Sequence, residues 1–137
     1  MRTVTKRFPL FVFLMAVVFA PAFTPTDIKT TINEINAAIK SGDVSKIIGY
    51  LSDPVDLTLP SADDSYSKAQ AGMILKKFFS QNKVKSYVSK RTGKSVDGSM
   101  FTIGSYTAQN GKVFRSYILI KSSGGKNLIQ FIEFEEE

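Results

Sequence analysis

The chain has 137 residues, a formal net charge of +6 at pH 7, 43% hydrophobic residues, and neither cysteine nor histidine. This composition supports one hydrophobic core. It excludes disulfide cross-links, catalysis by a histidine base or a Ser-His-Asp triad, and ordinary zinc or copper sites. We therefore expect no metal and no cofactor.

Residues 1–22 have the pattern of a secretory signal peptide. Three basic residues precede an apolar run over residues 8–19, and Ala20-Pro21-Ala22 supplies a small-x-small cleavage site. The run is shorter than the ~20 residues that a membrane-spanning helix needs, so we expect cleavage and no stable membrane anchor. The sequence thus predicts a periplasmic or secreted protein.

Residues 23–137 are predicted to form a single domain. Removing the three basic residues of the leader from the net charge of +6 leaves +3. This is an ordinary charge for a soluble domain, so we expect no nucleic-acid partner.

Two helices are predicted at the start of this domain. Thr26 is the expected N-cap of the first helix, in which isoleucines recur on one face until Gly42 ends it. Asp43 caps a second, shorter helix, which ends before the helix-breaking Asp53-Pro54.

A strand, a loop and a third helix follow. Residues 55–59 alternate as a strand, and residues 61–65 read as a polar loop. Ser67 and Gln70 have the spacing of a capping box at the start of the third helix.

The remainder of the chain predicts four strands, over residues 84–92, 100–108, 113–121 and 128–134. Asn110-Gly111 indicates a type I′ hairpin between the second and third of them. The expected order is α-α-β-α-β-β-β-β, an α+β domain in which three N-terminal helices pack on a curved antiparallel sheet.

This order resembles the nuclear-transport-factor-2-like, or cystatin-like, cone. Nearly the whole mature sequence is similar to a family of small secreted bacterial proteins, domain of unknown function 4783. The segments that carry the resemblance are Leu51-Ser52, residues 55–60, residues 66–71, Ile74-Leu75, Phe78-Phe79, Gly93, Ile103-Gly104, Gly111, Phe114-Arg115 and Ile129-Gln130. The resemblance implies the cone fold and no established activity. It also implies that a cavity between sheet and helices, and pairing through the outer sheet face, are common among proteins of this fold.

Alternation along the strands predicts which side chains line the inner wall of such a cone. The predicted inward faces are Phe101, Ile103, Ser105 and Thr107; Phe114, Ser116, Ile118 and Ile120; and Leu128, Gln130, Ile132 and Phe134. Polar groups on a buried wall either bond to one another or orient a ligand. The candidate ligand-binding residues are Tyr87, Arg91, Ser105, Ser116 and Gln130.

Catalysis is not expected. Cone enzymes similar to the steroid isomerases place a general-base Asp late on the first strand, whereas Asp56 lies near the start of the predicted strand and no histidine is available.

The leading hypothesis is therefore an exported, non-enzymatic domain that binds a small ligand or a partner protein. The alternatives are a dimerisation module with a filled core and, third, a lyase-like or isomerase-like cavity enzyme. A homodimer is expected through an apolar outer sheet face, predicted to hold Tyr106, Val113, Arg115, Tyr117, Leu119, Ile129 and Phe131.

Overall fold

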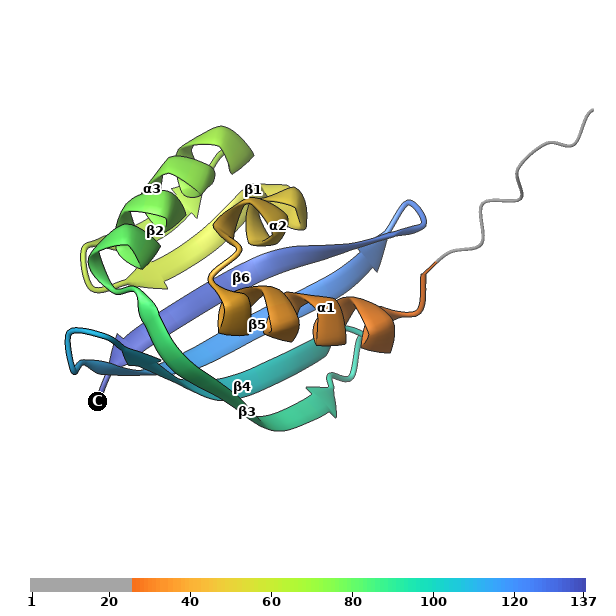
Figure 1. Cartoon of the computed structure of the whole chain (residues 1–137). Coiled ribbons are helices and arrows are strands. Elements are labelled where there is room, and N and C mark those ends of the chain that lie inside the picture. Colours follow the sequence, from red (N-terminus) through yellow and green to blue (C-terminus); the bar gives the residue numbers. More distant parts are fainter. Residues whose placement is uncertain (1–25) are drawn as a thin grey trace, which may run out of the picture.

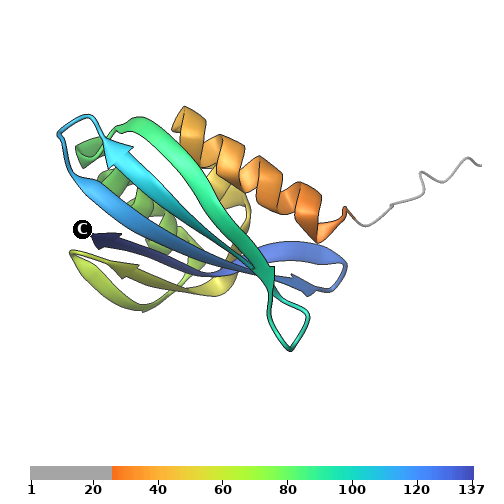
Figure 2. The same ribbon diagram turned by 90° about the horizontal axis from the view of Figure 1, so that it is seen from below.

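The computed structural model describes residues 26–137, so the predicted signal peptide at residues 1–22 lies outside the described residues. Within this part of the chain, six strands form one curved sheet and three helices lie against one of its faces (Figure 1, Figure 2). The bounds are α1 Ile28–Ser41, α2 Val44–Gly49, β1 Leu51–Leu59, β2 Ala62–Tyr66, α3 Lys68–Gln81, β3 Val84–Lys94, β4 Met100–Ala108, β5 Val113–Ser123 and β6 Lys126–Glu136.

The strands follow the order β2-β1-β6-β5-β4-β3 across the sheet. Neighbouring strands are antiparallel, except that β1 and β6 run parallel. The predicted α+β class is thus confirmed, but the expectation of a wholly antiparallel sheet is wrong at one strand pair. Side-chain alternation reports which face a residue takes and carries no information on strand direction, so the sequence pattern could not reveal this pair.

Helix ends are fixed by the local signals that the sequence contains. The N-cap of α1 is Asp27 and not the predicted Thr26, because the Asp27 carboxylate accepts a hydrogen bond from the Lys29 amide at 3.3 Å. Gly42 ends α1 in the left-handed conformation, with φ 72°. Ser67 caps α3 as predicted, with its hydroxyl accepting from the Gln70 amide at 3.2 Å.

An additional strand, β2, occupies most of the segment that was predicted to be a polar loop. It pairs antiparallel with β1, with Asp64 opposite Leu57. The side chains of β2 are exposed or only half-buried because it is an edge strand. A strand whose two faces both meet solvent has no hydrophobic alternation, which is the signal the prediction relied on.

Strand β1 begins at Leu51, four residues before the predicted start. It passes through Asp53-Pro54, and its register with β6 shifts between Leu51 and Asp56. The buried Ser52 hydroxyl lies 2.7 Å from the Pro54 carbonyl and 2.8 Å from the Ile129 carbonyl. A polar side chain thus supports the strand where the regular ladder is interrupted.

The hairpin between β4 and β5 forms where predicted but with another turn. The Gly111 amide donates to the Ala108 carbonyl at 3.1 Å, and the Ala108 amide donates to the Lys112 carbonyl at 2.9 Å. Only glycines have positive φ among the described residues, and Gly111 has φ 89°, so Asn110 cannot supply the positive φ of a type I′ turn. Instead the Asn110 side chain donates to the Asn82 side chain at 2.9 Å, which ties the hairpin to the end of α3.

The inner face of the sheet differs from the prediction on two strands. On β4 the buried side chains are Met100, Thr102, Tyr106 and Ala108, so the predicted inward set of Phe101, Ile103, Ser105 and Thr107 faces outward. On β5 the prediction is confirmed, because Phe114, Ser116, Ile118 and Ile120 are buried.

On β6 a register shift relative to β5 inserts Gln130 between the positions that pair with Leu119 and Ile120. Ile129 is therefore buried, in place of the predicted Leu128 and Gln130, whereas Ile132 and Phe134 are buried as expected. A bulge reverses which face of the sheet each side chain takes on one side of it.

No helix within residues 26–137 is long and apolar enough to cross a membrane.

Candidate functional site

Aromatic rings pack against one another between α3 and the inner face of the sheet. The ring centroid of Phe78 lies 5.1 Å from that of Phe134 and 5.2 Å from that of Phe114, and Phe79 lies 5.7 Å from Tyr106. The Tyr106 hydroxyl donates to the Asn82 carbonyl at 2.5 Å, and burial raises its pKa to about 12. This part of the interior is packed core.

A cluster of polar side chains lies beside this core, where α1 crosses β3, β4 and β5. The Tyr87 hydroxyl is 3.2 Å from the Ser116 hydroxyl and 3.4 Å from the Asn36 side-chain oxygen. The Thr102 hydroxyl is 3.1 Å from the Ser89 hydroxyl and 3.5 Å from the Asn36 amide. Ser116 and Thr102 are fully buried and Tyr87 nearly so. Burial raises the pKa of Tyr87 above its ordinary value, and the hydrogen bonds with Ser116 and Thr102 offset only part of this rise.

Gly104 makes room for this cluster. It pairs with Ser89 on one side and Ser116 on the other, directly beneath the Tyr87 ring. A Cβ atom at this position would lie 2.5 Å from the Tyr87 hydroxyl oxygen, closer than any real contact of that kind. The absence of a side chain at Gly104 therefore lets the ring lie flat on the sheet and reach Ser116.

The structure brings together two of the five predicted ligand-binding residues, Tyr87 and Ser116. Arg91 and Ser105 lie on the opposite face of the sheet, since Arg91 pairs with the outward Ile103 and Ser105 with Val88 and the exposed Arg115. Gln130 is half-buried in the β6 bulge and does not lie in a regular inner row. The register shift of β3 between Ser89 and Arg91 explains the position of Arg91. The face assignment of β4 explains Ser105, and the bulge of β6 explains Gln130.

Asn36 and Thr102 were missed by the sequence reasoning. Asn36 is a polar residue between Ile35 and Ile39, beside the apolar stripe of α1, and a half-buried amide at such a position was an available signal. Thr102 lies on the β4 face that was assigned to solvent, so its burial could not be recognised.

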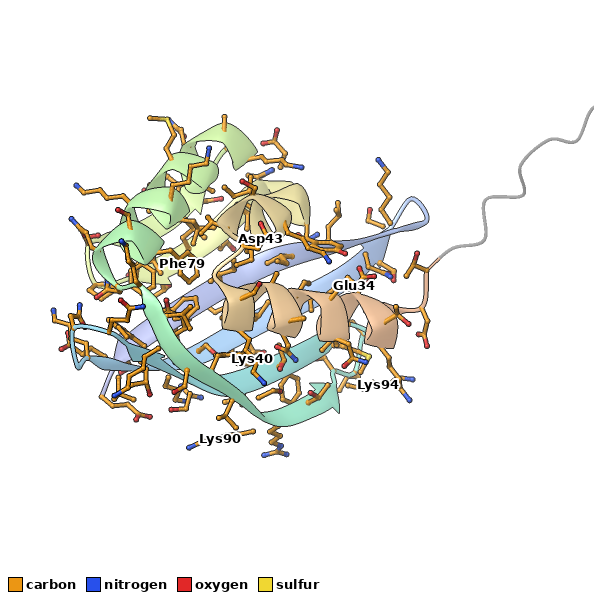
Figure 3. All side chains as sticks on the ribbon, viewed as in Figure 1. Glu34, Lys40, Asp43, Phe79, Lys90 and Lys94 are labelled. Carbon is orange, nitrogen blue, oxygen red and sulfur yellow. The ribbon has the colours of Figure 1, made fainter. Side chains whose placement is uncertain are left out.

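A hollow of about 330 Å³ opens to solvent at the edge of this polar cluster. It is lined by Asn36, Ala37, Lys40, Tyr87, Val88 and Ser89. In Figure 3, Lys40 extends from α1 on the side of β3, whereas Glu34 lies on the other side of the helix. Glu34 is engaged there by the Tyr50 hydroxyl, which donates to its carboxylate.

The outer face of the sheet, turned away from the helices, carries a second group of notable side chains. Its half-buried apolar members are Phe101, Ile103, Val113, Tyr117, Leu119, Leu128 and Phe131. The rings of Phe101 and Tyr117 are stacked with centroids 5.8 Å apart, and Phe131 lies 5.8 Å from Tyr117. The predicted outer residues Tyr106 and Ile129 are instead fully buried on the inner side.

Charges on the outer face are segregated along one transverse row. The strand register places Arg91, Ile103, Tyr117, Glu133, Thr58 and Asp63 in this row, from β3 to β2. A basic side chain stands at one end, acidic side chains stand towards the other, and apolar ones lie between. On β5, Arg115 forms ion pairs with Glu133 at 3.6 Å and Glu135 at 3.9 Å.

The acidic residues within residues 26–137 do not gather into a potential metal site. No cluster of three or more potential metal ligands occurs there. Asp56, the one carboxylate considered as a general base, is exposed and pairs with Phe131 on the outer face. It therefore points away from the interior of the cone.

Comparison with known proteins identifies the family. The sequence matches the family described as "Domain of unknown function (DUF4783)" over residues 32–135. A crystal structure of a DUF4783 family protein from Bacteroides fragilis is 30% identical, with a TM-score of 0.70, and the match covers 76% of this chain and 96% of that one. A second family structure, from Bacteroides ovatus, is 28% identical, with a TM-score of 0.70, and the match covers 76% and 93% of the two chains.

An NTF2-like protein of unknown function from Cytophaga hutchinsonii shares the fold at 14% identity and a TM-score of 0.59, over 84% of this chain and 94% of that one. No curated protein matches the sequence. The chain belongs to the DUF4783 family and has the NTF2-like fold.

Proposed function

We propose that this domain is a non-enzymatic interaction module that pairs with a second copy of itself through the outer face of the sheet. The observation that carries the proposal is the aromatic group of Phe101, Tyr117 and Phe131 on β4, β5 and β6 of that face, in which the first two rings are stacked. Aromatic side chains that remain partly exposed in a contiguous patch are typical of protein interfaces. The aromatic packing between α3 and the sheet favours this role over that of a cavity enzyme.

The charges of the outer face select one arrangement of the two copies. A twofold axis parallel to the strands would place β3 of one copy over β1 and β2 of the other. The basic Arg91 would then face the acidic end of the row, which contains Asp63. An axis perpendicular to the strands would place β3 over β3 and set like charges opposite each other. The row is therefore self-complementary in the first arrangement only.

Analytical ultracentrifugation from low to high micromolar concentration tests this proposal. The wild type is expected to form a dimer, and Tyr117→Lys is expected to be monomeric because it buries a charge at the centre of the contact. Lys77→Glu, on the exposed surface of α3, is the control and should leave the dimer intact. A wild type that remains monomeric at high micromolar concentration would rule out the dimer.

A charge exchange tests the orientation separately. Arg91→Glu and Asp63→Arg should each weaken the dimer, and the two changes combined should restore it, because the ion pair is then re-formed with its signs reversed. If the double variant is weaker than both single variants, the axis along the strands is wrong even though the dimer exists.

We also propose that residues 1–22 direct export of the chain, on the pattern of basic residues, apolar run and cleavage site. When expressed with its native start, the protein should be recovered from the periplasm or medium with Phe23 as its first residue. Recovery of the uncleaved chain in the membrane fraction would contradict this.

A further inference from the structure

The hollow between α1 and β3 is lined by hydrogen-bond donors and one cation, and it takes no part in the proposed dimer. Ser89 and Tyr87 contribute hydroxyl groups, and Asn36 contributes an amide. Each of these side chains also belongs to the polar cluster that reaches the buried Ser116 and Thr102. The hollow is thus continuous with a hydrogen-bonding wall.

Asn36 is the loosely held member of that wall. Its amide nitrogen lies 3.5 Å from the Thr102 hydroxyl, and its oxygen is 3.4 Å from the Tyr87 hydroxyl. Good hydrogen bonds of these types are about 2.7 to 3.0 Å long. An amide has two N–H donors, and Asn36 lies half-buried at the solvent side of the cluster. It can therefore donate to a group in the hollow without uncovering a buried polar atom.

Lys40 adds a positive charge at the same place. It lies four residues after Asn36, and residues at this spacing share one face of a helix. The ion pairs formed within residues 26–137 involve Lys112, Arg115 and Lys121, and Lys40 takes part in none of them. No carboxylate lines the hollow. Its electrostatic complement is therefore an anion.

We propose that this hollow binds a small organic molecule that carries a carboxylate. The carboxylate lies between the Lys40 ammonium and the Asn36 amide, and the Ser89 hydroxyl provides a further donor. A single lysine matches a single negative charge, whereas a phosphate dianion would require more cationic partners. The Ala37 methyl and the Tyr87 ring offer apolar surface for the body of the ligand. A volume of about 330 Å³ suits a compact molecule.

The test is an NMR titration of the ¹⁵N-labelled protein with three probes. Benzoate carries a carboxylate on a flat apolar body, benzyl alcohol is its neutral analogue, and inorganic phosphate is an oxyanion without a body. Benzoate should shift the Asn36 side-chain amide and the Val88 and Ser89 backbone amides in a saturable manner, with a Kd of roughly 1 mM. Benzyl alcohol should not saturate these signals, and phosphate should bind about tenfold more weakly.

Two substitutions place the binding at this hollow. Lys40→Met should weaken benzoate binding about tenfold, because it removes the charge-assisted contact. Lys29→Met is the matched control, since Lys29 is also exposed on α1 but does not line the hollow, and it should leave the affinity unchanged. Ser89→Ala, on the exposed edge strand, should weaken binding about threefold.

Three results would overturn the proposal. The first is a linear benzoate response up to about tenfold the expected Kd. The second is an equal loss of affinity in Lys40→Met and Lys29→Met, which would indicate general charge attraction. The third is phosphate binding as tightly as benzoate, which would show that the organic body makes no contact. None of these results depends on whether the outer face forms a dimer.

Discussion

Replacement of Gly104 by alanine is the sharpest test of how the polar cluster is built. The new Cβ atom would lie 2.5 Å from the hydroxyl oxygen of Tyr87 and 2.6 Å from its Cζ atom. The ring must therefore lift from the sheet, and the 3.2 Å bond between Tyr87 and Ser116 must break.

The expected cost follows from three contributions. Forcing the new Cβ atom against the Tyr87 ring costs about 1 to 3 kcal/mol. Leaving buried hydroxyls without a partner costs about 1 to 3 kcal/mol more. Alanine lowers the conformational entropy of the unfolded chain, which stabilises the folded protein by about 0.4 to 1 kcal/mol. The midpoints of these contributions sum to about 3 kcal/mol, so Gly104→Ala should lower the free energy of unfolding by about 3 kcal/mol.

Urea denaturation followed by circular dichroism measures this change. Gly49→Ala is the control, because no atom lies within 4 Å of the Cβ that would be added at the end of α2. That variant should be unchanged or up to about 1 kcal/mol more stable.

A Tyr87→Val variant tests whether the clash with the Tyr87 ring causes this loss of stability. In a Tyr87→Val protein the ring is gone, so adding Gly104→Ala should cost little or nothing, and the coupling between the two sites should be about 2 kcal/mol or more. A Gly104→Ala variant within about 0.5 kcal/mol of wild type, or additive effects in the double variant, would refute this account of the cluster.

Three further predictions concern other parts of the molecule. Ser67→Ala should cost about 1 kcal/mol, measured by urea denaturation, because the Gln70 amide loses its 3.2 Å cap, and the sedimentation behaviour should not change. The pKa of Asp97 is lowered from 3.8 to about 2, chiefly by its bonds with Ser99. The ionised carboxylate therefore stabilises the folded state above pH 3.8, and this contribution is lost as the pH falls through about 2. An unchanged Ser99 amide signal in an NMR titration over that range would contradict this prediction. Gln130→Leu should change the free energy of unfolding, measured by thermal denaturation, by less than about 1 kcal/mol, because Gln130 is half-buried in a bulge. A loss of about 3 kcal/mol would show that the Gln130 amide is a hydrogen-bond partner of buried groups.

Local signals in the sequence were sufficient for much of the fold. The isoleucine stripe of α1, the Gly42 stop and the Ser67 cap act over a few residues, so their effects could be read from those residues alone. The hairpin at Gly111 was located for the same reason, although its turn type was not. The family resemblance supplied the cone, and the comparisons confirmed it.

The tertiary structure decided which face of β4 is buried. Both faces of that strand carry large apolar side chains, so alternation alone left two solutions, and the more apolar set was assigned inward. Tyr106 points inward because its hydroxyl donates to the Asn82 carbonyl and its ring packs in the aromatic core. Phe101, on the opposite face, stacks on Tyr117. Contacts with residues distant in the sequence made that choice.

The candidate site could be predicted only in part, for the same reason. Tyr87 and Ser116 were recognised as polar residues on strands, yet their partner Asn36 is 51 residues before Tyr87 and lies on a helix. The sequence determines that these side chains need hydrogen-bond partners, since burial without them costs free energy. Which partners they receive depends on the packing of α1 across β3 and on the missing side chain at Gly104, and these are properties of the folded chain.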